Sequence, residues 1–213
     1  MNTKGLLART AAGALGGMLL IGAAGAAIAD EIDGSDVTVD VQIDALPPVG
    51  ALTMSVAENT TSLTEGASTD PELRQFNGVL PTVTVTDDRE DVPSGVYWYV
   101  TGQSSAFSAS GVPDIGADKL GWVPRLLTEG NGEVAPGDEV VTSLDEPTQG
   151  SGDSANNVGL VGEELLALAL DSSEAHAVGE WQADADLFLK TPKAVAPGAY
   201  SATLTLTLWE DAY

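Results

Sequence analysis

Apolar and polar residues alternate strictly in several short segments of this chain. From Val37 to Ile43, every odd position is branched and apolar and every even position is polar. The same alternation recurs in three further segments, 52–56, 82–86 and 203–208. Alternation with a period of two places one face of a strand on a core and the other in water, which is typical of antiparallel sheets. We therefore predict strands in all four segments.

Turn signals rich in Gly and Pro separate these segments. They are Pro47-Pro48, Pro93-Ser94-Gly95, Pro136-Gly137-Asp138 and Pro197-Gly198, with a Gly-, Ser- and Asn-rich loop at 149–157. Short strands between such turns predict an all-β fold, an antiparallel β-sandwich of Greek-key or jelly-roll type. One segment, 163–170, has a composition that also suits a helix, and we predict a strand there. No linker divides the sequence after residue 29, so we expect one domain over 30–213.

The parity of the alternation also predicts which side chains are buried. Residues of the apolar parity should form the core, while the intervening Thr residues should be exposed. The predicted core residues are Val37, Val39, Val41, Ile43, Val83, Val85, Trp98, Leu204, Leu206 and Leu208.

The N-terminus has the layout of a secretory signal peptide. Lys4 and Arg9 precede an uncharged, Gly- and Ala-rich stretch that ends in Ala27-Ile28-Ala29. A positive start, an apolar middle and an Ala-x-Ala finish predict cleavage after Ala29. The alternative is a retained membrane anchor, because the uncharged run approaches the length of a bilayer span. We expect residues 1–29 to be removed and the chain to be secreted or displayed at the cell surface, with no further membrane contact.

Removal of this segment makes an acidic chain more acidic. The whole sequence carries a formal net charge of −24 at pH 7. Residues 1–29 contain two basic and no acidic residues, so the remainder has six basic and 32 acidic residues and a charge of −26. A field of this sign repels nucleic acids and anionic head groups, so we expect no nucleic-acid partner.

No arrangement of residues in the sequence points to catalysis, so we predict a non-catalytic protein. The chain has no cysteine, which excludes thiol chemistry and Cys-ligated metals, and its single histidine, His176, is expected in a surface loop. The acidic segments 30–36 and 87–91 contain oxygen ligands that suit Ca²⁺, but neither has the spacing of an EF-hand. We expect solvated acidic loops and no cofactor or metal, with Ca²⁺ as the alternative.

The tryptophans are more informative about binding. Trp98 shares its parity with Val96 and Val100, which favours a place in the core. Trp209 falls on the Thr face of the last predicted strand. If that face is solvated, its ring can stack on a sugar or a partner protein; the alternative is that it caps an open end of the sandwich.

Several stretches of the sequence resemble the WxL-domain surface proteins of Gram-positive bacteria, especially the divergent forms of high-GC lineages. In the family's Trp-x-Leu motif the chain has Trp98-Tyr99-Val100, with Val in place of Leu. In its C-terminal motif the residues Tyr200, Leu204, Thr205 and Leu208 match, and Leu206 stands where the second Trp belongs. The stretches that carry the resemblance are 80–89, 95–100, 120–124, 183–190 and 197–208.

The resemblance implies a secreted, β-rich domain that associates non-covalently with the cell wall. Its partners would be peptidoglycan or other surface proteins. The candidate glycan- or wall-binding residues are Trp98, Tyr200 and Trp209, of which we expect Trp209 to be exposed near Tyr200. The alternative within binding proteins is an adhesin or a subunit of a surface assembly that recognises protein, followed by a carbohydrate-active enzyme.

Overall fold

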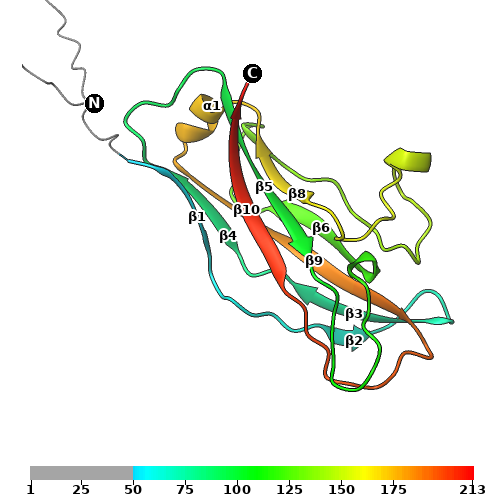
Figure 1. Cartoon of the computed structure of the whole chain (residues 1–213). Coiled ribbons are helices and arrows are strands. Elements are labelled where there is room, and N and C mark those ends of the chain that lie inside the picture. The colour runs from blue at the N-terminus through cyan, green and yellow to red at the C-terminus, as the bar shows by residue number, and fades with distance from the viewer. Residues whose placement is uncertain (1–49) are drawn as a thin grey trace, which may run out of the picture. The chain divides into compact units, whose positions relative to one another are not determined.

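A computed structural model describes residues 50–213, which form two antiparallel sheets (Figure 1). The predicted all-β sandwich is therefore confirmed. The first sheet contains β1 (Leu52–Val56), β4 (Val83–Asp87), β9 (Glu180–Pro192), β3 (Leu73–Val79), β2 (Thr64–Gly66) and β6 (Leu120–Leu126). The second contains β10 (Leu204–Ala212), β5 (Val96–Ser104), β8 (Glu164–Ala169) and β7 (Val134–Pro136). The short helices are η1 (Ala117–Lys119), η2 (Gly152–Ser154) and α1 (Ser172–His176).

The long strand β9 organises the first sheet. Leu187 pairs with both Gly78 of β3 and Trp122 of β6, and Ala183 pairs with both Val83 of β4 and Leu126 of β6. Since a strand has two edges, β3 and β4 share one edge of β9 and β6 takes the other. The outer strands β1 and β2 therefore lie on the side of the sheet opposite β6.

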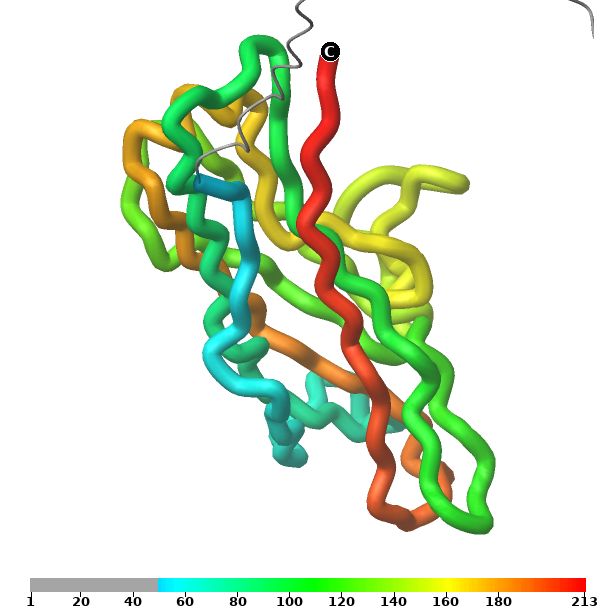
Figure 2. The backbone as a smooth tube through the Cα atoms, turned by 60° about the vertical axis from the view of Figure 1, so that its left-hand side comes forward, coloured from blue at the N-terminus to red at the C-terminus, as the bar shows by residue number. Residues whose placement is uncertain are grey.

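The second sheet is arranged around β5, with β10 on one side and β8 followed by β7 on the other. Because β6 contacts both β7 and β8, the two sheets come together on that side. On the opposite side, β1 ends the first sheet and β10 ends the second. Figure 2 shows these two strands running along the same side of the domain.

Three of the predicted strands in the described region are confirmed. The alternating segments form β1, β4 and β10, and the ambiguous segment 163–170 forms β8 rather than a helix. Strand β8 pairs with β5 on one side and with β7 on the other, and this central position explains its mostly apolar sequence. The predicted strand Val37–Ile43, the signal peptide 1–29 and the turn at Pro47-Pro48 lie outside the described residues. The described part of the chain contains no helix long and apolar enough to cross a membrane.

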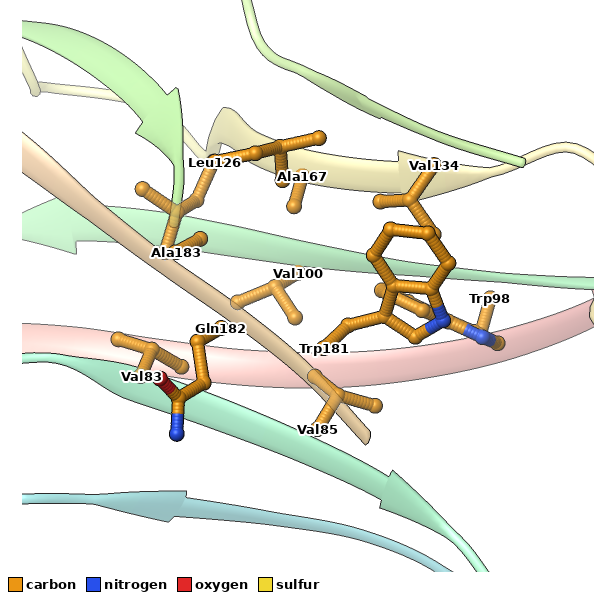
Figure 3. Close-up of a pocket in the computed structure, with 11 residues that line it drawn as sticks. Val83, Val85, Trp98, Val100, Leu126, Val134, Ala167, Trp181, Gln182 and Ala183 are labelled. Atoms are coloured by element: carbon orange, nitrogen blue, oxygen red, sulfur yellow. The ribbon is translucent and has the colours of Figure 1, made fainter. Parts of the chain in front are cut away.

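The core lies between the sheets and contains three tryptophans. Trp98, Trp122 and Trp181 are at most 4% exposed. Gly102 leaves room for one of them, because a Cβ at this position would lie 2.6 Å from the Trp122 ring. Figure 3 shows Trp98 and Trp181 among the branched side chains of both sheets, around a residual cavity of about 10 Å³. A cavity of this size is at the lower limit for a single water molecule, so the centre of the sandwich is tightly packed.

Burial follows the predicted parity in β4 but only in part in β10. Val83, Val85 and Trp98 are buried as predicted. Leu204, Leu206 and Leu208 face the core but are only half-buried, so the prediction of full burial was wrong for them. Strand β10 ends its sheet, and among the described residues no strand lies beyond it to cover these side chains.

This partial burial sets the expected effect of Leu206→Ala. We expect a loss of about 1–2 kcal/mol in the free energy of unfolding, less than the 2–5 kcal/mol typical of a fully buried leucine. Thr205→Ala, at the exposed neighbouring position, should change it by less than about 0.5 kcal/mol. Urea denaturation of both variants measures the difference. Equal losses for the two variants would contradict the inward orientation of Leu206.

Candidate functional site

The three predicted binding residues lie in different surroundings. Trp98 on β5 is 1% exposed and belongs to the core, whereas Trp209 on β10 is 39% exposed. Tyr200 is half-buried in the connection before β10, where its hydroxyl donates to the carbonyl oxygen of Ala196 at 3.1 Å. The structure therefore presents only Trp209 to a large ligand and keeps Trp98 away from the surface.

Trp209 and Tyr200 do not adjoin. Trp209 pairs with Tyr99 in the middle of β5, whereas Ser201, next to Tyr200, forms a bridge with Ser108 beyond the end of β5. The expected exposure of Trp209 is thus found, but its expected neighbour is at another part of the sheet. The neighbours of Trp209 are instead tyrosines.

Four aromatic side chains form a row on the outer face of the second sheet. We call Tyr97, Tyr99, Trp209 and Tyr213 the aromatic row. The ring centroids of Tyr97 and Tyr99 are 5.9 Å apart, those of Tyr99 and Trp209 are 6.4 Å apart, and those of Tyr97 and Tyr213 are 5.0 Å apart. Tyr213 is 82% exposed, so the row ends in an accessible ring.

The local sequence explains why these rings share a face. Tyr97 and Tyr99 are two positions apart on β5 and lie on either side of the inward-facing Trp98. Trp209 pairs directly with Tyr99, and residues paired across antiparallel strands point to the same face. Our sequence analysis missed the tyrosines, although the parity that places Trp98 inside also places Tyr97 and Tyr99 outside.

Hydrogen bonds hold both ends of the row. The Trp209 indole Nε1–H donates to Thr101 Oγ1 at 3.0 Å, and the Tyr213 hydroxyl donates to the carbonyl oxygen of Leu170 at 2.6 Å. Loss of solvent around Tyr97 and the negative charge of Asp211 raise the pKa of the Tyr97 hydroxyl. This tyrosine is therefore neutral at physiological pH, and the row offers uncharged rings on an otherwise acidic protein. Such a surface suits an uncharged ligand with apolar faces.

Arg89, Asp87 and Glu210 form a partly buried ion-pair cluster. The Arg89 guanidinium donates two hydrogen bonds to Asp87, at 2.7 and 2.6 Å, and a third to Glu210 at 2.8 Å. Asp87 ends β4 in the first sheet and Glu210 is on β10 in the second, so Arg89 joins the two sheets. Burial raises the pKa of Asp87, but the hydrogen bonds and charge of Arg89 outweigh it and leave this pKa below its ordinary value.

His176 lies beside this cluster and not in a surface loop as predicted. It is the last residue of α1, its side chain is one-third exposed, and its Nδ1 is 3.6 Å from Asp87 Oδ1. Ser172, one helical turn earlier, is fully buried, so its hydroxyl is out of reach of a substrate. Neither the Ser172 hydroxyl nor His176 Nδ1 has a hydrogen-bond partner among the described residues, so Ser172 is not the accessible nucleophile that a hydrolytic triad requires.

Within the acidic segment 87–91, the carboxylate of Asp87 binds the guanidinium of Arg89. The segment does not form a cage of oxygen ligands. Within residues 50–213 no group of three or more acidic or histidine side chains converges as a metal site would require. The other acidic segment, 30–36, lies outside the described residues. The geometry of the described region therefore offers an aromatic surface as its candidate site.

The chain was compared with protein families, curated proteins and solved structures. No family model, no curated protein and no solved structure matches the chain.

Proposed function

We propose that this protein is an exported, non-catalytic surface module that associates non-covalently with cell-wall glycan through the aromatic row. The observation that carries the proposal is the line of four neighbouring rings on one face of the second sheet, with Trp209 and Tyr213 open to solvent. The faces of sugar rings carry C–H groups that stack on aromatic rings, and each such contact contributes about 1 kcal/mol. The N-terminal signal pattern and the resemblance to WxL-domain proteins support the same location.

The charge of the chain narrows the class of glycan. With a net charge of −26 after removal of residues 1–29, the exported protein repels anionic wall polymers unless divalent cations bridge the two. Neutral glycan strands need no such bridge. We therefore propose that the row binds the uncharged sugar faces of the wall and that binding persists in a chelator.

Trp209→Ala should weaken wall binding several-fold while leaving the fold nearly intact. The ring is 39% exposed and contributes one stacking surface, so a loss of about 1 kcal/mol corresponds to a roughly fivefold weaker affinity. Co-sedimentation of the purified protein with cell walls, with and without EDTA, measures this change. Thr205→Ala, on the same strand at another exposed position, is the matched control.

Two outcomes would redirect the proposal. If binding disappears in EDTA, cation bridges to anionic polymers hold the protein and stacking does not. If the protein stays in the supernatant with or without Ca²⁺, the wall-binding proposal is wrong. The second candidate, an adhesin or a subunit of a surface assembly, would then take its place. The observation that favours it is the edge of β10, which no other strand of residues 50–213 covers.

A further inference from the structure

A large apolar groove lies between the two sheets on the side of β1 and β10. Its volume is about 1040 Å³. The first sheet lines it with apolar residues that include Met54, Val56, Phe76 and Leu189, and the second sheet with Leu204 and Leu206. The loop 58–63 and the connection 195–203 complete the lining. Figure 2 shows β1 and β10 diverging toward the end of the domain at which β2 lies. The half-buried leucines of β10 are thus part of an unfilled core.

Among residues 50–213, no strand pairs with the edge of β1 that faces away from β4. Ala57 N–H donates to Thr82 O, and Asp88 N–H donates to Ala51 O. Residues in an antiparallel strand point their backbone groups alternately to the two sides. The backbone N–H and C=O groups of the odd-numbered residues in and around β1 point toward β4. Those of the even-numbered Leu52, Met54 and Val56 therefore point away from it.

These even-numbered residues also have partly exposed apolar side chains. Leu52 and Met54 pack against the core yet remain half-buried, and Val56 is 40% exposed. On the neighbouring β4, the inward residues Val83 and Val85 are at most 4% exposed. This difference in exposure between β1 and β4 is expected for a strand that lacks a neighbour on one side. An added strand would cover both the backbone edge of β1 and these side chains.

The sequence contains a segment with the properties that this edge requires. Val37–Ile43 has branched apolar residues at every odd position and polar residues between them. Eight residues separate Ile43 from Leu52, and a connection of this length is sufficient to reverse the chain. The described residues begin at Gly50, directly before β1, so this segment is tethered at the end of the groove's own strand.

We propose that Val37–Ile43 lies in the groove as an added strand, antiparallel to β1, and completes the core of the sandwich. Its backbone pairs with the free edge of β1, and its odd-numbered side chains cover the groove. The tether favours the segment of the same chain over that of a second copy, because it raises the local concentration of the segment at this edge. The groove is thereby closed to other strands, which protects the edge from association with other chains.

The orientation of the side chains limits the register. Residues that pair across antiparallel strands share a face, so the inward-facing Met54 must oppose an apolar residue of the segment. Opposite Met54, the segment can place Val39, Val41 or Ile43. Gln42 cannot take this position without turning all the apolar side chains to solvent.

Disulfide trapping tests this arrangement directly, because the natural chain has no cysteine. We would combine Met54→Cys with Val39→Cys, Val41→Cys or Ile43→Cys in the otherwise complete chain, with Met54→Cys and Gln42→Cys as the matched control. Two cysteines form a disulfide readily only when their Cα atoms lie within about 7 Å and their side chains face each other. We expect one of the three pairs to form a disulfide within the monomer at least tenfold faster than the control.

The remaining outcomes contradict the proposal. Rates equal to that of the control for all three pairs would show that the segment is not beside β1. A disulfide that joins two chains would show that a second copy fills the groove. As a measurement without thiols, amide hydrogen exchange at Met54 and Val56 should be at least tenfold faster in Val41→Asp than in Gln42→Asp. Equal exchange in these two variants would likewise overturn the proposal.

Discussion

Trp98→Ala should lower the free energy of unfolding by about 3–5 kcal/mol, the range for large aromatic residues in closed cores. The Trp98 side chain is 1% exposed and packs between the sheets, where the neighbouring cavity is only about 10 Å³ (Figure 3). Strands β4, β5, β8 and β9 around this cavity are each paired with a strand on both sides, so they have little freedom to move into the space. Chemical denaturation followed by circular dichroism measures the loss.

Two variants make this result interpretable. Trp98→Phe keeps an aromatic ring, so it should cost less than Trp98→Ala and stay folded if the alanine variant does not. Trp209→Ala removes the same side chain from the surface and should cost about 1 kcal/mol or less. Similar losses for Trp98→Ala and Trp209→Ala would contradict the assignment of one ring to the core and the other to the binding surface.

Asp87→Asn should destabilise the protein by about 3 kcal/mol at pH 7. Breaking a buried ion pair from one side typically costs 3–5 kcal/mol, and Arg89 keeps Glu210 as a partner, so we expect the lower end. The side chains of Asp87 and Arg89 are 5% and 13% exposed, so water screens this pair weakly. The loss should appear as a lower denaturation midpoint.

The same pair gives the stability a defined dependence on pH. The pKa of Asp87 is lower in the folded protein than the ordinary value of an aspartate, so the folded state prefers the ionised carboxylate. Its contribution is fully present above the unfolded pKa and is lost as the pH falls through the folded pKa, below about 4. Asp87→Asn should therefore lose less stability than the natural protein between pH 5 and pH 2. Parallel losses in the two proteins would show that Arg89 does not hold this carboxylate.

Much of the fold could be predicted because alternation is a local property. The period of two in 52–56, 82–86 and 203–208 placed strands correctly and assigned the inward side of each. It also placed Trp98 inside and Trp209 outside, because parity alone decides the face of a strand. The segment 163–170 could not be assigned by periodicity, and its two partner strands decide its conformation.

The candidate site depended on contacts between distant parts of the chain. The rings of Tyr97 and Tyr213 lie 5.0 Å apart although the two residues are distant in the sequence, and Arg89 reaches Glu210 across 121 positions. Alternation specifies the face on which a residue lies but not which strands become neighbours. The resemblance likewise grouped Tyr200 with Trp209, whereas pairing with β5 places Tyr99 beside Trp209.

The residue pattern was thus sufficient to predict the strands, their inward faces and the exposure of Trp209, because each of these follows from the backbone geometry of a single strand. The order of the strands had to come from the assembled sheets. That order leaves β10 and β1 at the edges, keeps Leu206 half-buried and opens the groove, because burial at an edge depends on which strand lies beyond it.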